Sequence, residues 1–216
     1  TPIKGHRPHY DGPGVEWADS VALYGDSCTW GEAIDEEDRL HVQLENIQAK
    51  KVYNFGYPAQ SNEHIFKKFV RHVTEHGYPK KVVIGWTSPW RMCVVNEQNA
   101  DVLSVEAIGH WTSNITPEMG VGKDMISLCP KTLLVRTSDY MMAVREMCKG
   151  RTEIFEWHIK PVVRAAGVLN PTALEIGWYK YSWAKGLYHL EFLDRGFDNM
   201  HPGPKSIKRL AEVICE

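Results

Sequence analysis

Ser27 stands where a serine hydroxyl can act as a nucleophile. It follows the apolar run 21–24 and the pair Gly25-Asp26, and a turn of small and polar residues comes after it. Such a run is typical of a buried strand, and a turn at its end exposes the hydroxyl and directs nearby backbone N–H groups to the same point. A serine in a turn also caps helices, so this stretch alone leaves both interpretations open.

The candidate base for this serine is His201, near the other end of the sequence. Asp198 lies three residues before it, and Pro202-Gly203 follows at the start of a predicted helix. This spacing lets the carboxylate accept a hydrogen bond from one ring nitrogen, which leaves the other nitrogen as a base of fixed tautomer. A serine needs such a base because its hydroxyl is a poor nucleophile at neutral pH. The alternative interpretation is a histidine that caps the helix or packs beside Pro202.

Strands and helices in alternation are needed to bring these two ends of the chain together. We expect strands at 19–25, 51–55, 81–86 and 187–193, and helices at 32–50, between Ser61 and Gly77, and at 132–149, 151–166 and 204–215. This alternation is typical of a parallel sheet with helices on both faces, whose chemistry lies at the carboxyl ends of the strands. Ser27, the turn at Ala59 and the turn Thr87-Ser88 are therefore expected in one neighbourhood.

Four further residues are candidates for supporting the reaction. Asn54 ends the second strand and is expected to tie loop backbones together, and the N–H group near Ala59 is expected to point into the pocket. Thr87 offers a hydroxyl after the third strand. Arg91 would contact an anionic group or a sugar hydroxyl of a substrate, or form a surface ion pair, which is the plainer interpretation.

Composition narrows the class of protein. The 216 residues predict one domain, 1–216, with a lid-like insertion around 91–130. A net charge of -2 provides no positive field, so nucleic acid is not an expected partner. The sequence has no apolar run long enough for a membrane span and its polar start does not resemble a signal peptide, so we predict a cytoplasmic protein. The ten histidines are scattered and the five cysteines contain no CxxC pair, which predicts reduced thiols and no metal.

Taken in order, these segments resemble the sequence blocks of the SGNH or GDSL hydrolase family. The matching segments are Gly25-Asp26-Ser27 for the first block, Asn54 to Asn62 for the second, Gly85 to Ser88 for the third and Asp198-x-x-His201-Pro202 for the fifth. Two positions depart from the family pattern: Ala59 stands at the oxyanion glycine, and Thr87 at the oxyanion asparagine. The resemblance covers the start through Trp90 and residues 187–216, whereas 91–186 matches no family that we can name.

The resemblance implies a three-layer α/β/α fold with a parallel, flavodoxin-like sheet. It also implies hydrolysis of small-molecule or polysaccharide esters, or of thioesters, through an acyl-serine, with no metal or organic cofactor. By this analogy Ser27 attacks the carbonyl, His201 takes and returns the proton, and Asp198 orients His201. The oxyanion would lie against the N–H groups of Ser27 and Ala59, with help from Thr87.

Three other functions remain open at this point. A catalytically weakened module could bind glycans, with Trp86, Trp90 or Trp111 stacked on sugar rings, although core packing is expected for at least one of them. An acyltransferase would use the same residues as a hydrolase and would differ in how it excludes water. A cysteine hydrolase would use Cys28, which we expect to point into the fold. Oligomeric state cannot be predicted from these features.

Overall fold

The computed structural model describes residues 16–89, 91–95, 105–108, 130–159 and 186–216. A five-stranded sheet lies at its centre, in the order β2-β1-β3-β6-β7, and every neighbouring pair is parallel. The strands are β1 (Val21–Tyr24), β2 (Val52–Asn54), β3 (Lys81–Trp86), β6 (Glu153–Ile159) and β7 (Tyr188–Leu190). This is the strand order of flavodoxin-like doubly wound sheets, as the sequence predicted.

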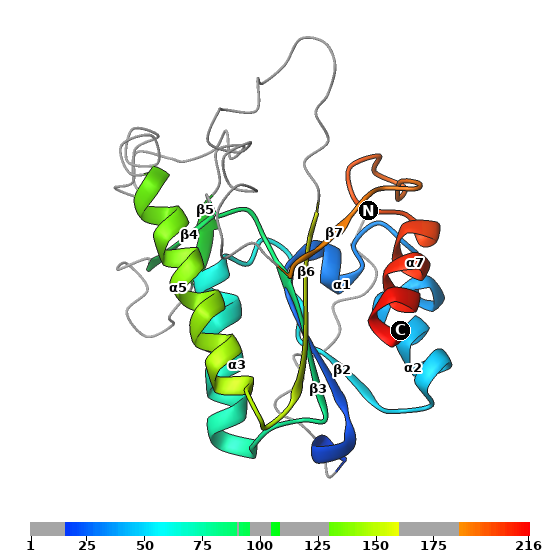
Figure 1. Cartoon of the computed structure of the whole chain (residues 1–216). Coiled ribbons are helices and arrows are strands. Elements are labelled where there is room, and N and C mark those ends of the chain that lie inside the picture. Colours follow the sequence, from blue (N-terminus) through cyan, green and yellow to red (C-terminus); the bar gives the residue numbers. More distant parts are fainter. Residues whose placement is uncertain (1–15, 90, 96–104, 109–129, 160–185) are drawn as a thin grey trace.

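Helices cover both faces of the sheet (Figure 1). One face packs against α2 (Leu40–Gln48) and α7 (Pro204–Cys215), and the other against α3 (Asn62–His76) and α5 (Pro130–Cys148). The described residues also form three short helices: η1 (Trp17–Asp19), α1 (Ser27–Trp30) and η2 (Glu36–Asp38). The expected three-layer α/β/α architecture is therefore confirmed.

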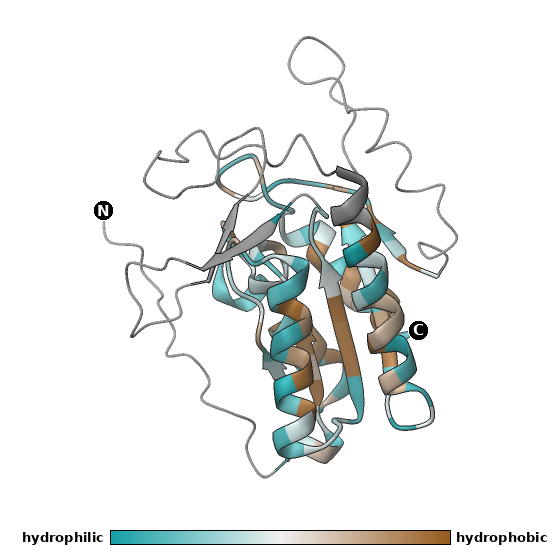
Figure 2. Cartoon of the chain, turned by 90° about the vertical axis from the view of Figure 1, so that its left-hand side faces the viewer, coloured by the Kyte–Doolittle hydropathy of each residue, from teal (hydrophilic) through white to brown (hydrophobic). Residues whose placement is uncertain are grey.

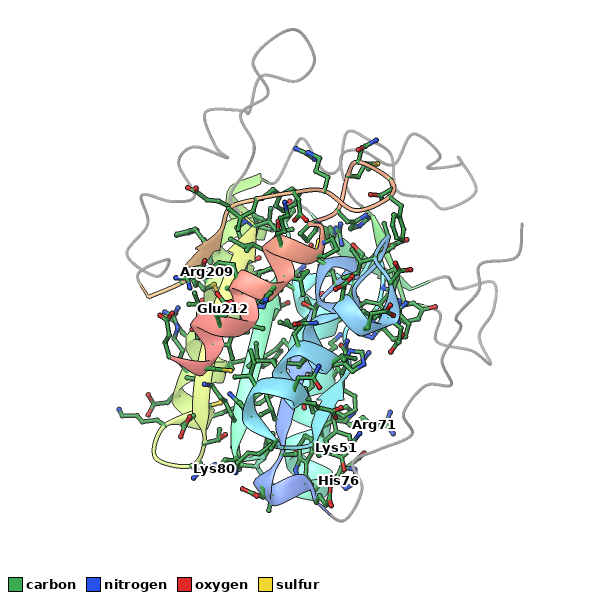
Figure 3. All side chains as sticks on the ribbon, turned by 90° about the vertical axis from the view of Figure 1, so that its right-hand side faces the viewer. Lys51, Arg71, His76, Lys80, Arg209 and Glu212 are labelled. Carbon is green, nitrogen blue, oxygen red and sulfur yellow. The ribbon has the colours of Figure 1, made fainter. Side chains whose placement is uncertain are left out.

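The strands are apolar on both faces, as parallel strands between two helical layers must be. In β1, Ala22 and Tyr24 join the core under α3 and α5, whereas Val21 and Leu23 join the core under α2 and α7. Figure 2 shows the resulting apolar sheet between helices whose outer faces are hydrophilic. The outer face of α7 carries an ion pair, Arg209 to Glu212 at 3.3 Å, both labelled in Figure 3.

Several element bounds follow local signals in the sequence. The expected strand at 81–86 and the expected helix at 204–215 have these bounds in the structure. The Ser61 hydroxyl caps α3 by accepting a hydrogen bond from the His64 N–H group at 3.2 Å, and Gly77 ends this helix with a φ of 78°. The predicted helix 32–50 is shorter, because Ala33 has a φ of 62° and Arg39 is extended, so α2 begins at Leu40.

The predicted helix at 151–166 is wrong, because residues 153–159 form strand β6. The apolar residues that suggested a helix face also alternate along a strand: Ile154 packs in one core, and Phe155 and Ile159 in the other. Six residue pairs align β6 with β3, from Lys81–Glu153 to Trp86–His158. Pairing with a central strand decides between two structures that the local pattern permits equally. The last residues of the predicted helix lie outside the described part of the chain.

The expected insertion around 91–130 contains two described strands, β4 (Met92–Val95) and β5 (Val105–Ile108). They pair antiparallel in a small sheet separate from the central one. Most of the insertion, including Trp111, lies outside the described residues. None of the helices described in the structure is long and apolar enough to cross a membrane.

The histidine of α3 that packs under the sheet makes stability depend on pH. Burial, reinforced by the charge of Lys68, lowers the pKa of His72 to about 4. Its ring lies 4.2 Å from that of Phe55, and Nδ1 lies 3.2 Å from the Tyr24 hydroxyl. Between pH 6.5 and 4 the unfolded chain binds a proton that folded His72 does not, so the free energy of unfolding falls as the pH falls.

We therefore expect His72→Gln to flatten the fall in stability between pH 6.5 and 4.5. The His72 side chain contributes at most about 1.4 kcal/mol per pH unit to the dependence of the unfolding free energy on pH. Urea unfolding followed at both pH values measures the effect, and Thr74→Gln, at an exposed position on the same helix, is the matched control. A slope equal in both variants would show that His72 titrates normally in the folded protein.

Candidate active site

The structure brings Ser27 and His201 into contact across 174 positions of sequence. Ser27 is the first residue of α1, directly after β1, and its Oγ lies 2.9 Å from Nε2 of His201. The other ring nitrogen, Nδ1, lies 2.5 Å from Oδ2 of Asp198. In Figure 1, α1 and the start of α7 lie at the same end of the sheet, where the strands have their carboxyl ends. The three residues proposed from sequence therefore form one continuous chain of contacts.

A tight turn holds Asp198 and His201 in this relation. Oδ1 of Asp198 accepts hydrogen bonds from the N–H groups of Met200 at 2.8 Å and His201 at 3.0 Å. Asn199 between them has a φ of 58°, a conformation that asparagine tolerates better than most residues. Burial would raise the pKa of Asp198, but these N–H groups and the imidazole outweigh it and lower the pKa to about 2. The carboxylate is therefore ionised wherever the protein is folded at ordinary pH.

A second set of hydrogen bonds closes the loop that contains this turn. The carboxylate of Asp194 accepts from the N–H groups of Lys205 and Ser206, both at 2.9 Å, and so caps the start of α7. The Ser206 hydroxyl in turn accepts from the N–H group of Leu193 at 2.9 Å. Sequence reasoning missed Asp194 and Ser206. An acidic residue and a serine on either side of a Pro-Gly helix start were the available signal.

The carboxylate of Asp26 fixes the segment that carries Ser27. Its Oδ1 accepts from the N–H group of Cys28 at 3.0 Å, which caps α1. Its Oδ2 accepts from the Thr87 hydroxyl at 2.6 Å and from Nη1 of Arg91 at 3.0 Å. Asp26 is only 7% exposed, so these contacts replace the water that the carboxylate loses on burial.

The expectations for Thr87 and Arg91 need correction in the light of these contacts. A hydroxyl has one proton, and Thr87 donates it to Asp26, so the side chain cannot donate it to an oxyanion at the same time. Arg91 forms an ion pair, as the plainer interpretation held, but the pair is largely buried rather than on the surface. Both side chains therefore support Asp26, which the sequence analysis treated only as part of a motif.

The second block supplies a tie between loops and an exposed turn. Asn54 donates from Nδ2 to the Thr29 carbonyl at 3.1 Å and accepts from the Gly56 N–H group at 3.0 Å, as expected of a loop tie. Ala59 is exposed and has a φ of 63°, in the region that favours glycine. This backbone shape gives a physical reason for a glycine at this position, and alanine there costs about 1 kcal/mol.

Asn62 is a further residue whose role the sequence did not reveal. Its amide forms two hydrogen bonds of 2.9 Å with the backbone of Thr87, one to the N–H group and one to the carbonyl. These bonds fix the end of β3 to the start of α3. The sequence analysis named Asn62 only as the end of the second block. The fold brings it to Thr87, because α3 begins where β3 ends.

Cysteine chemistry and tryptophan stacking find little support among the described residues. Cys28 is buried, and burial raises the pKa of its thiol well above the ordinary value, so the thiol stays protonated and points into the fold as expected. Trp86 is buried too, and its Nε1 donates to Glu156 at 2.8 Å, so it cannot stack on a sugar. Trp90 and Trp111 lie outside the described residues.

Comparison with known proteins supports the fold. No family model matches the sequence, and no curated protein matches it. Among solved structures, TesA matches 91% of this chain over 96% of its own, with a TM-score of 0.54 and 12% identity. A carbohydrate esterase family 2 enzyme with a carbohydrate-binding domain, from Corynascus thermopiles (Myceliophthora fergusii), has a TM-score of 0.52 and 11% identity. Here 96% of this chain aligns with 66% of that one.

A lipolytic protein described as G-D-S-L family, from Desulfitobacterium hafniense, covers 90% of this chain and 97% of its own at 17% identity, with a TM-score of 0.49. At these identities the likeness concerns the fold. The chain has the α/β/α fold of the SGNH hydrolases, and the resemblance found in its sequence blocks is confirmed at that level.

We expect Asp26→Asn to destabilise the protein by about 2–4 kcal/mol, because it leaves the largely buried guanidinium of Arg91 without its counter-charge. Urea unfolding at pH 7 measures the change. The matched control is Glu63→Gln, which removes a carboxylate from the exposed pair with Lys67 and should cost less than about 1 kcal/mol. Equal small losses in both variants would show that the Asp26 contacts contribute no more than a surface pair.

Proposed function

We propose that this protein is a serine hydrolase that cleaves carboxylic esters through an acyl-serine intermediate. The observation that carries the proposal is the chain of contacts from Ser27 Oγ to His201 Nε2 and from His201 Nδ1 to Asp198. A serine, an imidazole and a carboxylate in this order are the parts that nucleophilic acyl transfer requires. The carbohydrate esterase family 2 enzyme among its structural neighbours supports the same class of reaction.

In the proposed reaction His201 Nε2 takes the proton of Ser27 as Oγ attacks the ester carbonyl. Asp198 holds the proton on Nδ1 and offsets the positive charge that forms on the ring. His201 then gives the proton to the oxygen of the departing alcohol. Water repeats the sequence on the acyl-serine, with His201 as its base, and releases the acid.

Backbone N–H groups are the proposed support for the oxyanion. Ser27 is the first residue of α1, so its N–H group has no acceptor within that helix and is available to a ligand. The N–H group of Ala59, in its left-handed turn, is the second proposed donor. Thr87 contributes indirectly, because its hydroxyl holds Asp26 and thereby the helix start that presents Ser27.

The proposed substrates are carboxylic esters, including acyl groups on carbohydrate. The family 2 carbohydrate esterase among the structural neighbours supports this substrate class. The leaving group would then be a hydroxyl of a small molecule or a polysaccharide. A screen of acetylated sugars and simple aryl acetates covers both possibilities.

We expect Ser27→Ala to lower kcat for a short-chain aryl acetate by at least about 10³-fold, since the nucleophile is lost. A fluorophosphonate probe should label the wild type at Ser27 and leave the variant unlabelled, which mass spectrometry of the modified peptide measures. A wild-type protein that neither takes the label nor cleaves any short ester would rule out the proposed function.

Thr87→Val tests whether this hydroxyl stabilises the oxyanion. Loss of a direct oxyanion donor typically lowers kcat by about 10²–10³-fold. Because Thr87 donates to Asp26, we expect a loss of less than about 10-fold in kcat and a loss of about 1–2 kcal/mol in stability. Steady-state kinetics and urea unfolding of the same preparation separate the two effects. A drop of 10²-fold or more in kcat with unchanged stability would place Thr87 in the oxyanion hole.

A further inference from the structure

A second carboxylate lies beside His201, next to the nitrogen that contacts Ser27. Oε2 of Glu32 is 3.6 Å from Nε2 of His201, the nitrogen that lies 2.9 Å from Ser27 Oγ. Asp198 contacts the opposite ring nitrogen, so the role of orienting the ring is already filled. In the proposed reaction Nε2 passes its proton to the departing alcohol, which must therefore lie close to Nε2. Glu32 thus lies beside the position that the leaving group has to occupy.

The backbone on either side of Glu32 fixes this placement. Gly31 ends α1 with a φ of 86°, and the N–H groups of Gly31 and Glu32 both donate to the Ser27 carbonyl at 3.0 Å. On the other side, the Ala33 carbonyl accepts from the N–H group of Phe197 at 2.8 Å. A side chain at Gly196 would place its Cβ 2.5 Å from the Ala33 oxygen, so glycine allows the two loops to approach this closely. The segment 31–33 therefore connects the loop of the proposed nucleophile with the loop of the proposed base, and Glu32 lies at its centre.

The charge next to Nε2 is negative. The segment 32–38 contains five carboxylates and no lysine or arginine, and Arg39, which follows it and packs against Gly31, pairs with Glu36 at 2.9 Å. Glu32 is nearly half exposed, so its carboxylate can interact with a group that arrives from solvent. The nearby guanidinium of Arg91 is paired with Asp26, and that of Arg195 donates to the Asn199 carbonyl. Among these charged side chains, Glu32 would therefore interact most directly with a charged leaving group at Nε2.

We propose that Glu32 is a specificity-determining residue, whose charge disfavours esters with an anionic leaving group and favours esters with a neutral or cationic one. The inference rests on the proposed function and specifies the substrate class of the same site. Two unit charges about 6 Å apart interact strongly enough at a protein surface to change a rate by roughly three-fold or more. Exposure and salt keep the effect of one such carboxylate at roughly three- to ten-fold.

Three acetate esters with the same acyl group test the charge of the leaving group alone. They are 4-acetoxybenzenesulfonate, phenyl acetate and (4-acetoxyphenyl)trimethylammonium. We measure kcat/KM for each ester with the wild type, Glu32→Gln and the control Glu37→Gln. The control removes the same charge from an exposed position in the same acidic segment. Intrinsic differences in reactivity between the esters cancel when each variant is compared with the wild type.

Glu32→Gln should raise the ratio of kcat/KM for the anionic ester over the cationic ester by roughly three- to ten-fold. Glu37→Gln should change this ratio by less than about two-fold, and Glu32→Lys should shift it further in the same direction as Glu32→Gln. Added salt should reduce the difference between wild type and Glu32→Gln. Circular dichroism confirms that each variant is folded.

Two results would overturn the inference. A ratio that does not change in Glu32→Gln and Glu32→Lys would show that Glu32 does not sense the leaving group. An equal shift in Glu37→Gln would assign the effect to the net charge of the segment. In both cases the wild type still cleaves the esters, so the proposed function stands. Failure of the wild type to cleave any of the three esters would instead remove the proposed function, and this inference with it.

Discussion

The buried carboxylate of Asp26 is the contact on which the arrangement around Ser27 depends. It joins two segments that are distant in sequence: the start of α1, and the stretch after β3 that contains Thr87 and Arg91. A buried carboxylate without such partners would lose its hydration with no compensation, so the two segments must meet for the fold to be stable. The same contacts set the direction of the first turn of α1, and with it the position of the Ser27 hydroxyl. Stability and the geometry of the proposed nucleophile therefore have a common cause.

A separate set of hydrogen bonds, between residues closer in sequence, holds the proposed base His201. Asp194 and Ser206 close the loop in front of α7, and within that loop Asp198 accepts two N–H groups of its own turn. These bonds fix the ring of His201 without help from the sheet. The two sets of contacts meet where the Ala33 carbonyl accepts from the Phe197 N–H group, and this hydrogen bond helps to set the spacing between the proposed nucleophile and the proposed base. Glu32 lies next to this junction, which is why a residue of no known motif can reach the reacting nitrogen.

Much of the architecture could be read from the sequence, because its signals are local. The strand at 81–86 and the helix at 204–215 have clear apolar patterns and clear ends. The residues 153–159 were assigned to a helix because their apolar spacing suits a helix and a strand alike, and only pairing with β3 decides. Ser27, Asp198 and His201 could be found because each lies in a short ordered motif. The contacts of Thr87 and Asn62 could not be found in this way. A sequence does not show which group accepts the single proton of a hydroxyl, or which groups bond to the oxygen and the nitrogen of an amide.

The long separation between Ser27 and His201 has a consequence for synthesis of the chain. A ribosome produces the proposed nucleophile and the first three strands of the sheet long before it produces the proposed base, 174 residues later. Asp194 cannot cap α7 until Lys205 and Ser206 exist, so the loop of His201 forms only when that helix begins to fold. A nascent chain therefore carries Ser27 without its proposed proton acceptor while these 174 residues are made. Chemical competence would arise late, together with the docking of α7, and a chain that stops before this helix would remain inert.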